Sequence, residues 1–216
     1  MKVIVHNSVS LDGSLLGFAA DMAAHYRIAR GFRAAIHLVG SNTALEGLKM
    51  FHKKLPSEQE KDLRKPKASA KRPLWVIPDS EGKLKGKLHV LRQSGYCRDV
   101  VVLTTSVTPK GYLRYLTERE YDCHYMGNGP IDYAHAFAVL AQEYRARVLL
   151  SDSGPTLNGI LINAGLADEI SLLVHPCIVG AGRLALFAGV KSEIALRLAR
   201  SRTIAGKPWL LFRVVA

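Results

Sequence analysis

Residues 148–175 read VLLSDSGPTLNGILINAGLADEISLLVH, and this stretch indicates the fold class most directly. Its first three residues form an apolar run that is typical of a buried strand. Small and polar residues follow, and a helix is predicted over residues 156–164, because Gly165 is a residue type that commonly ends a helix. A second apolar run at residues 170–175 predicts another strand. The order strand, helix, strand is typical of parallel strands joined by a packed helix.

The same alternation extends through most of the chain. Further strands are predicted at residues 3–5, 35–40, 74–77, 100–103, 121–126, 193–203 and 209–215. Further helices are predicted at residues 19–33, 43–54, 109–119 and 132–145, with Ser41 or Asn42 capping the second and Asp132 capping the fourth. In the first of these helices the expected apolar positions are Met22, Ala23, Tyr26, Ile28 and Ala29.

The expected fold class is therefore α/β, with a mostly parallel central sheet and helices on both faces. The last strands have no helices between them and should form an antiparallel C-terminal edge. In the strand predicted at residues 193–203, apolar and other residues alternate, which suggests one wetter face. No repeat and no linker divides the sequence, so a single domain over residues 1–216 is expected.

The composition is that of a folded globular protein. Its 216 residues are 48% hydrophobic and 22% charged, which excludes the disordered and fibrous classes. The opening residues MKVIVH contain too short an apolar run for a secretory signal, and no later stretch has the length and apolarity of a membrane span. We therefore expect a cytoplasmic protein with no membrane partner.

Cysteines and histidines give no metal-binding pattern. Cys97, Cys123 and Cys177 lack a CxxC spacing, which favours reduced interior residues over a metal site. Cys123 and His124 are adjacent in a predicted strand, where they would point to opposite faces and could not easily share a metal. The eight histidines form neither an HxH nor an HExxH arrangement. We expect no bound metal.

A basic segment supplies half of the net charge of +12. Residues 49–72 contain nine basic and three acidic residues, and prolines at positions 56 and 66 interrupt them. This pattern predicts a loop or a short helix followed by a mobile connection. The charge indicates either a solvated surface or attraction of polyanions and phosphorylated small molecules. No aromatic residue lies among the lysines after Phe51, so a nucleic-acid partner is not expected.

Residues 152–158, DSGPTLN, lie between a predicted strand and a predicted helix. Ligands of open α/β sheets bind outside the carboxyl ends of the strands. Ser153 and Gly154 are small enough for backbone amides to approach a phosphate, and the positive N-terminal end of the helix would attract it. Taken alone, the pattern is also that of a structural turn, and both interpretations stay open.

Residues 150–182, LSDSGPTLNGILINAGLADEISLLVHPCIVGAG, resemble the C-terminal signature of the riboflavin-biosynthesis reductases. In that family a strand leads into a glycine pair, a Thr-Leu helix start, a Gly-Leu-x-Asp-Glu turn and a Pro-x-x-x-Gly segment. Shorter motifs follow in the family's order: SLDG at residues 10–13, LVGSNT at 38–43, Asp79-Ser80 with Lys83, and GNGPID at 127–132. The resemblance covers nearly the whole chain.

This resemblance implies a dihydrofolate-reductase-like fold, NADPH as the cofactor and a homodimer. The positions that would hold the phosphates and ribose of NADPH are Thr43, Ser153, Gly154, Pro155, Thr156 and Leu157. Ser80 and Lys83 match positions at the adenosine end, where a hydroxyl and a cation would favour a 2′-phosphate. Ser8 would line the nicotinamide side. The implied reaction converts a ribosylamino-pyrimidine phosphate to its ribitylamino form.

The sequence departs from the family where the family binds its phosphorylated pyrimidine. Asp152, Ser153 and Gly154 replace a Glu-Gly-Gly sequence, and residues 44–48 replace an Asp-Asp-Pro segment. Gly31 stands where an arginine is expected. The resemblance therefore implies the cofactor more directly than the substrate, and the chain looks like a divergent branch of the family.

Reduction of the acceptor needs a proton donor. Asp152, at the end of a strand, and Asp21, in the first predicted helix, are the candidate catalytic residues, whereas Asp12 is assigned to a turn at residues 10–14. Candidate substrate-binding residues are Asp152, Lys53 and Lys54. Two alternatives stay open: a reductase of dihydrofolate, a pteridine or another small carbonyl or imine, and a polyanion-binding protein on a degenerate reductase scaffold.

Overall fold

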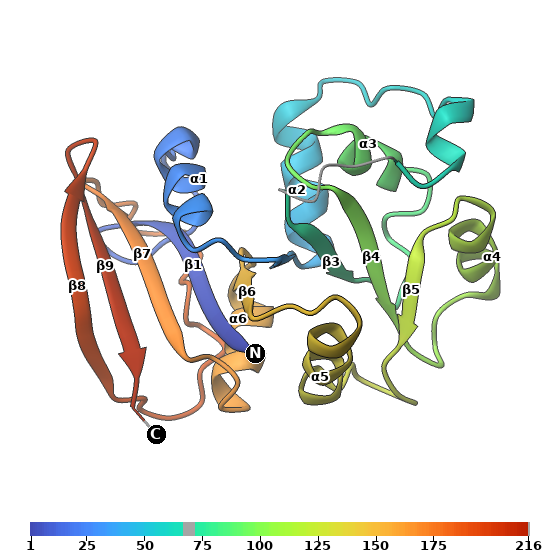
Figure 1. Ribbon diagram of the computed structural model, residues 1–216. Coiled ribbons are helices and arrows are strands. Elements are labelled where there is room, and N and C mark those ends of the chain that lie inside the picture. The colour runs from blue at the N-terminus through green and yellow to red at the C-terminus, as the bar shows by residue number, and fades with distance from the viewer. Residues whose placement is uncertain (67–71, 216) are drawn as a thin grey trace. The chain divides into compact units, whose positions relative to one another are not determined.

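The computed structural model describes residues 1–66 and 72–215. The chain forms two compact units, one made of Met1–Ala34 with Arg147–Ala216 and the other of Ala35–Ala146 (Figure 1). The single domain expected over residues 1–216 remains a prediction. In the part of the chain that the structure describes, no helix has the length and apolarity needed to cross a membrane.

The first unit is built on a mixed sheet. Its elements are β1 (Lys2–Ser10), α1 (Met22–Gly31), β6 (Val148–Ser151), α6 (Pro155–Asn163), β7 (Glu169–His175), β8 (Leu196–Ile204) and β9 (Lys207–Val214). The strands lie in the order β6-β1-β7-β9-β8. β6 and β7 both pair parallel to β1, whereas β9 pairs antiparallel to β7 and β8 antiparallel to β9. The predicted antiparallel C-terminal edge is confirmed.

Helices cover both faces of this sheet (Figure 1). On one face, Ile28 of α1 packs in a cluster with Leu173 and Trp209. On the other face, Ile162 of α6 packs in a cluster with Ile170. Leu173 and Ile170 lie three residues apart in β7, so their side chains point to opposite faces.

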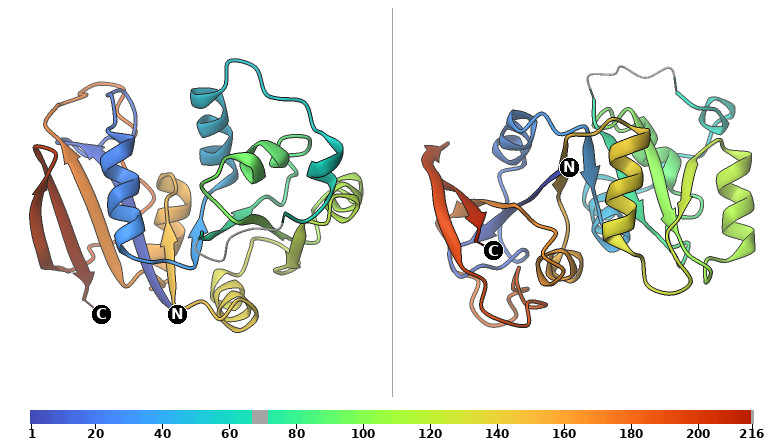
Figure 2. Two further views of the ribbon diagram at one scale, coloured as in Figure 1. Left: turned by 45° about the horizontal axis from the view of Figure 1, so that its top comes forward. Right: turned by 60° about the horizontal axis from the view of Figure 1, so that its bottom comes forward.

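The second unit is built on a parallel sheet. Its elements are β2 (Ile36–Leu38), α2 (Ser41–Phe51), the 3₁₀ helix η1 (Glu60–Leu63), β3 (Leu74–Pro78), α3 (Leu88–Gln93), β4 (Asp99–Thr104), α4 (Lys110–Glu118), β5 (Asp122–Tyr125) and α5 (Tyr133–Glu143). The strand order is β5-β4-β3-β2, and each neighbouring pair is parallel. One face carries α2, α3 and α4, whose Leu48, Leu91 and Leu116 share a core cluster with the strands. Figure 2 shows α5 on the other side of these strands. The predicted α/β class, mostly parallel and flanked by helices, is confirmed.

The cap predicted for the second helix is wrong. α2 begins at Ser41, and its N-cap is Gly40 in an extended conformation, which has no side chain to accept hydrogen bonds from the first backbone N–H groups of the helix. Ser41 and Asn42 therefore lie inside the first turn. The helix ends at Phe51, so Lys53 and Lys54 lie beyond it and are exposed.

Two short helices give no periodic signal: η1 lies in the segment predicted as a loop or a short helix, whereas α3 was not predicted. η1 has four residues and α3 has six, which is fewer than two turns in each case. An apolar stripe cannot be recognised over so short a length.

Arg92 of α3 fixes η1 and the residues that follow it. Its side chain is 3% exposed, and its Nε donates to Asp99 Oδ1 over 2.7 Å. Its other guanidinium nitrogens donate to four backbone carbonyls, those of Asp62, Arg64, Arg119 and Glu120. A buried guanidinium is tolerated only when its charge and its donors are satisfied in this way. The mobile connection predicted in the basic segment falls partly on residues 67–71, which lie outside the described residues.

The prediction of one wetter face for β8 is also wrong. Leu196 and Leu198 are 42% and 52% exposed, and the residues between them are exposed as well. β8 is the outermost strand of its sheet and pairs with β9 on one side. Both of its faces therefore meet solvent, and the strand begins at Leu196 rather than at residue 193.

The cysteines do not share one environment. Cys97 is buried, whereas Cys123 is exposed and Cys177 is partly exposed, so the expected interior position holds for Cys97 alone. Cys123 and His124 alternate in burial along β5, as predicted for opposite faces. Among the described residues, no three His, Cys, Asp or Glu side chains form a group that could hold a metal ion.

Candidate active site

The carboxyl ends of β6, β1 and β7 lie side by side because these strands are parallel. Asp152 directly follows β6, Ser8 lies near the end of β1, and His175 ends β7. A fourth polar residue, His25, comes from α1. This edge is where open α/β sheets bind ligands, so it is the candidate active site.

His25 belongs to the buried stripe of α1. The buried residues of this helix are Ala24, His25, Ile28 and Ala29, which share one face. The predicted stripe is partly wrong, because Ala23 is exposed and Met22 and Tyr26 are only partly buried. His25 was therefore not among the predicted residues, although its spacing of three and four residues from Ile28 and Ala29 is a signal that could have identified it.

His25 connects Ser8 to Asp152. Ser8 Oγ lies 3.1 Å from His25 Nδ1, and His25 Nε2 lies 3.1 Å from Asp152 Oδ2. The His25 side chain is 3% exposed, whereas that of Asp152 is 23% exposed. A hydrogen-bonded chain thus runs from a solvent-accessible carboxylate, through a buried imidazole, to a serine hydroxyl.

Two opposing effects act on the pKa of His25. Burial favours the neutral ring and lowers the pKa, whereas the charge of Asp152 and its hydrogen bond favour the imidazolium and raise it. The carboxylate prevails, so the pKa of His25 lies above its ordinary value. The pairing of the buried ring with the partly exposed carboxylate therefore favours the imidazolium form of His25.

His6 stacks on His25, with the ring centroids 4.4 Å apart. Trp209 Nε1 donates to Ser171 Oγ over 2.8 Å, and this hydroxyl lies 2.9 Å from His6 Nδ1. Because the indole can only donate, the hydroxyl is free to donate to Nδ1, and Nε2–H then donates to the backbone carbonyl of His25 over 3.2 Å. Burial, and then the charge of His25, lower the pKa of His6 to about 3. His6 is therefore neutral.

Asp21 is the N-cap of α1. Its Oδ1 accepts from the backbone N–H of Ala24 over 2.9 Å, and its Oδ2 accepts from Lys207 Nζ over 3.0 Å. The Ala24 amide, followed by the Lys207 ammonium, lowers the pKa of the Asp21 carboxyl. Its backbone N–H donates to His175 Nε2 over 2.9 Å. These contacts favour a capping role for Asp21 over an acid role.

Asp12 holds the turn that was predicted for it. Its carboxylate accepts from Ser10 Oγ over 2.6 Å and from the backbone amides of Val179 and Gly180. These three hydrogen bonds, that of Ser10 first, lower the pKa of Asp12 to about 2. Gly13 follows at φ +77°, a conformation that glycine adopts without strain.

Two asparagines fix the loop between β6 and α6. Asn7 Nδ2 and Asn158 Nδ2 both donate to the backbone carbonyl of Ser153, over 3.0 and 2.8 Å. Asn158 Nδ2 also donates to Asn7 Oδ1 over 3.0 Å, and Ser151 Oγ donates to Asn158 Oδ1 over 3.2 Å. Asn7 was not predicted as a site residue, because no local feature of the sequence shows that β1 faces this loop.

The N-terminus of α6 has an open first turn. Its N-cap, Gly154, has no side chain with which to cap the helix, and Pro155 occupies the first helical position. Leu157 is buried and Thr156 is exposed. The backbone amides of the first turn, at Thr156 and Leu157, lack hydrogen-bond partners within the helix itself.

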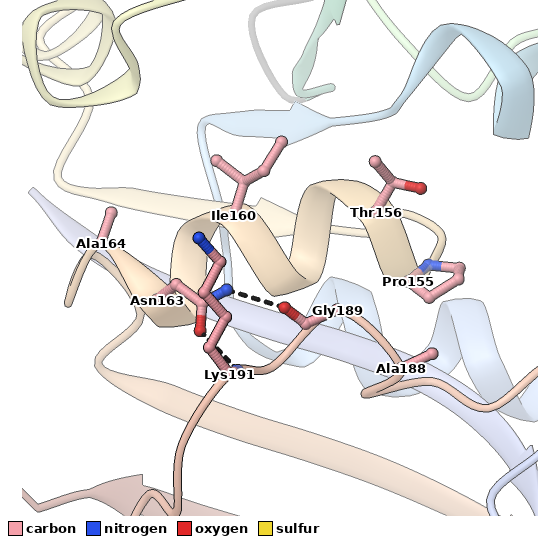
Figure 3. Close-up of a pocket in the computed structure, with 8 residues that line it drawn as sticks. All are labelled: Pro155, Thr156, Ile160, Asn163, Ala164, Ala188, Gly189 and Lys191. Carbon is pink, nitrogen blue, oxygen red and sulfur yellow. Dashed lines mark hydrogen bonds between the residues drawn. The ribbon is translucent and has the colours of Figure 1, made fainter.

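A shallow pocket of about 660 Å³ lies beside α6 (Figure 3). Its lining consists of Pro155, Thr156, Ile160, Asn163, Ala164, Ala188, Gly189 and Lys191. Asn163 of α6 is hydrogen-bonded to the loop that forms the other side of the pocket. Its Nδ2 donates to the Gly189 carbonyl over 2.7 Å, and its Oδ1 accepts from the backbone N–H of Lys191 over 3.0 Å. The lining contains no histidine, aspartate or glutamate, the side chains that serve most often as general acids and bases.

The remaining candidate residues belong to the second unit. Thr43 lies in the first turn of α2, and Ser80 and Lys83 lie in the turn after β3. Lys83 Nζ contacts Asn42 Oδ1 at 3.3 Å and Glu81 Oε1 at 3.2 Å. The start of α2 and the turn after β3 are thus brought together.

The buried carboxylate of Asp79 shapes this turn. It accepts from the backbone N–H groups of Lys83 and Leu84 over 2.9 and 3.0 Å. Gly82 has φ +71°, and an added Cβ would lie 2.9 Å from the Tyr112 ring. The backbone of Lys83 is therefore fixed, whereas its side chain is 33% exposed.

Comparison with known protein families shows to which family the chain belongs. The model of the RibD C-terminal domain matches residues 1–209. The chain belongs to this family. The resemblance inferred from the sequence motifs is confirmed, and this RibD C-terminal domain carries Asp152-Ser153-Gly154 at the loop described above.

Solved structures resemble this RibD C-terminal domain over its whole length. A pyrimidine reductase-like protein from Corynebacterium diphtheriae has a TM-score of 0.74 at 14% identity, over 100% of this chain and 92% of the other. RibD from Acinetobacter baumannii has a TM-score of 0.73 at 18% identity, and the match spans 99% of this chain but 58% of RibD. The riboflavin biosynthesis reductase Rib7 from Saccharomyces cerevisiae has a TM-score of 0.66 at 14% identity, over 99% and 90%. At these identities the likeness shows the fold alone. No curated protein matches the chain.

Proposed function

We propose that this protein is an NADPH-dependent reductase that converts a ribosylamino-pyrimidine phosphate to its ribitylamino form. The observation that carries the proposal is the meeting of Ser8, His25 and Asp152 at the carboxyl ends of three parallel strands, directly before the open N-terminus of α6. A hydride-transferring enzyme needs an element that binds the cofactor phosphates and a polar group beside the reacting atom. In the first unit, the first turn of α6 is the candidate for the former and the Ser8–His25–Asp152 chain is the candidate for the latter.

The loop before α6 fits the phosphates of a dinucleotide. In the proposed complex the amides of Thr156 and Leu157 donate to the pyrophosphate, and the positive end of the α6 dipole attracts it. Ser153, Gly154 and Pro155 form the turn that leaves this approach open. Asn7 and Asn158 keep the turn in place through the carbonyl of Ser153.

Further assignments come from the family resemblance. Thr43 contacts the phosphates or ribose, and Ser80 and Lys83 supply a hydroxyl and a cation for the 2′-phosphate. The exposed Lys53 and Lys54 attract the phosphate of the substrate.

NADPH supplies the hydride when it is bound. Ser8 lines the nicotinamide side, and Asp152 contacts the substrate. Through its pair with His25, Asp152 also takes part in delivering a proton to the atom that gains electron density. Asp21, whose carboxylate is occupied by the Ala24 amide and Lys207, is assigned to the cap of α1.

Binding and turnover of the purified protein test the proposal. We expect saturable binding of NADPH with a preference over NADH, and NADPH oxidation with the ribosylamino-pyrimidine phosphate. If NADPH is oxidised only with dihydrofolate or simple aldehydes, the proposed substrate is wrong but the cofactor assignment stands. Binding of polyanions that weakens steeply with salt, without NADPH binding, would favour the polyanion-binding alternative.

Gly154→Val tests the phosphate site. A branched side chain at the N-cap of α6 would stand where the pyrophosphate approaches, so NADPH affinity should fall at least tenfold. Gly129→Val is the matched control, because an added Cβ there has no heavy atom within 4 Å. Unchanged NADPH affinity in a folded Gly154→Val protein would show that the loop is only structural.

A further inference from the structure

The His25 ring is held from both sides within one unit. Asp152 binds its Nε2, and Ser8 binds its Nδ1. His6 covers one face of the ring in a stack, and Tyr26 meets it edge-on with the centroids 5.0 Å apart. The ring therefore cannot rotate without breaking two hydrogen bonds and a stack.

The protonation state of His25 decides which way the Ser8 hydroxyl points. When His25 is an imidazolium, both ring nitrogens donate, so Ser8 Oγ accepts from Nδ1 and its own O–H must point elsewhere. When His25 is neutral and Nε2–H donates to Asp152, Nδ1 accepts from Ser8 O–H. The hydroxyl can thus take a proton from the ring on one side and give one up on the other.

The charged groups around α1 favour the cationic state. From the β6 end, Asp152 supplies the negative charge in contact with the ring. From β1, the neighbouring His6 is neutral. From β7 and β9, His175 and Lys207 bind Asp21 at the start of α1, where the Lys207 charge is matched.

We propose that His25 holds the proton consumed in the reaction and delivers it through Ser8 Oγ to the substrate atom that becomes negative. The inference rests on the proposed reductase function and assigns to it a proton source. His25 itself touches neither substrate nor cofactor in this scheme and is a positioning residue. Asp152 keeps the ring charged and oriented, as the carboxylate of a Ser-His-Asp triad does.

The step balances in atoms and electrons. The electrophilic carbon of the C=N or C=O bond takes a hydride, with its two electrons, from NADPH, and the substrate is reduced while NADPH becomes NADP⁺. The nitrogen or oxygen of that bond takes the proton of Ser8 Oγ–H. Ser8 Oγ takes the Nδ1 proton of His25, which becomes neutral with Nε2–H still donating to Asp152. After product release, one proton from solvent returns to Nδ1 through Ser8.

Imidazole nitrogen spectroscopy tests the proton site without any cofactor. We expect the two ¹⁵N shifts of His25 to report an imidazolium that loses its proton at a pH above the ordinary pKa of 6.5, in line with the raised pKa. In Asp152→Asn the opposing charge is gone and burial dominates, so the pKa of His25 should fall below that of the wild type. The buried His89, whose Nε2 donates to the Pro56 carbonyl, is the control ring, and its ¹⁵N signals should be the same in the wild type and in Asp152→Asn.

Steady-state kinetics test delivery through Ser8. kcat/KM should fall as pH rises through the pKa of His25 measured by spectroscopy, and Asp152→Asn should move this limb by the same amount. Ser8→Ala should lower kcat by about a hundredfold, in the range for a lost proton donor, while His25 still titrates above 6.5. Ser8→Thr keeps the hydroxyl and should restore most of the turnover. Neither the Asp152 nor the Ser8 substitutions remove the buried His25 ring, so the packing under α1 is kept.

Each outcome separates the inference from the proposed function. Titration of wild-type His25 below pH 6.5, or a Ser8→Ala protein with wild-type turnover and pH profile, would overturn the proton path even if NADPH is oxidised. Absence of NADPH binding would overturn the reductase function. In that case the His25 titration alone would still test whether the Ser8–His25–Asp152 chain is charged.

Discussion

His6 stacks on His25 at a centroid distance of 4.4 Å, and the pKa values of the two rings are shifted in opposite directions. Burial and the neighbouring imidazolium keep His6 neutral, with its pKa lowered to about 3. Burial lowers the pKa of His25, but the charge and the hydrogen bond of Asp152 raise it above its ordinary value. Two side chains of the same type, in contact with each other, should therefore contribute to stability in opposite ways as pH changes.

His6 should make the protein sensitive to acid. Between its ordinary pKa of 6.5 and about 3, the unfolded chain binds a proton at this residue that the native state does not bind. The free energy of unfolding should therefore fall as pH decreases through this window, by about 1.4 kcal/mol per pH unit from His6. His6→Gln removes the titrating group, so urea titrations between pH 6 and 4 should show a shallower loss than in the wild type. Equal slopes would mean that His6 is not neutral in the native state.

His25 should act on the alkaline side. Its folded pKa is raised, so the stability from its pair with Asp152 is fully present below pH 6.5 and is lost as pH rises through the folded pKa. Asp152→Asn should abolish this alkaline loss and be less stable than the wild type near pH 6. Unfolding free energies measured at pH 6 and pH 9 for both proteins check the sign.

Mutation should distinguish the roles of the two carboxylates near α1, those of Asp152 and Asp21. Asp152→Asn should lower NADPH-dependent turnover by about a hundredfold or more, because the charge that holds His25 protonated is lost. Asp21→Asn keeps a good N-cap residue but loses the Lys207 pair, so it should reduce stability slightly and leave turnover unchanged. A collapse of turnover in Asp21→Asn alone would transfer the acid role to the first helix.

Gly159 should be intolerant of a methyl group. An added Cβ would lie 2.9–3.1 Å from the backbone of Gly189, so Gly159→Ala should destabilise the protein by about 1–3 kcal/mol. Gly47→Ala makes the same change inside α2, where no heavy atom lies within 4 Å, and should stabilise by about 0.5–1 kcal/mol. Denaturant midpoints of both variants test the pair. A stable Gly159→Ala protein would show that the two backbones are free to separate.

Lys83 should discriminate between the two nicotinamide dinucleotides. Under the proposed function its ammonium contacts the 2′-phosphate, so Lys83→Ala should weaken NADPH binding about tenfold and leave NADH binding nearly unchanged. Lys85→Ala removes an exposed charge two residues away and controls for general electrostatic attraction. If Lys83→Ala lowers the affinity for NADPH and NADH equally, Lys83 does not contact the 2′-phosphate.

Strands, most helices and the loop at residues 152–158 could be predicted because their signals are local. Apolar runs marked the buried strands, and Asp132 was correctly identified as the N-cap of α5. The cap at Gly40 could not be predicted, because a glycine N-cap gives no hydrogen-bonding signature and Ser41 and Asn42 are better caps by type.

The Ser8–His25–Asp152 chain depends on contacts between distant segments. Asp152 reaches His25 across 127 positions of sequence, and this contact requires the parallel register of β6 on β1 and the seating of α1 on that sheet. Asn7 reaches Ser153 across 146 positions for the same reason. Residue type alone could nominate Asp152, but only the packing of α1 shows that its partner is a histidine.

The buried guanidinium of Arg92 should make the segment around η1, which resembles a surface loop, unfold cooperatively with the core. It joins the carbonyls of Asp62 and Arg64 to those of Arg119 and Glu120, which follow α4. Neither segment can open alone without leaving a desolvated cation short of acceptors. In hydrogen exchange, η1 and the turn after α4 should therefore open together, as one unit with the core rather than as fraying surface.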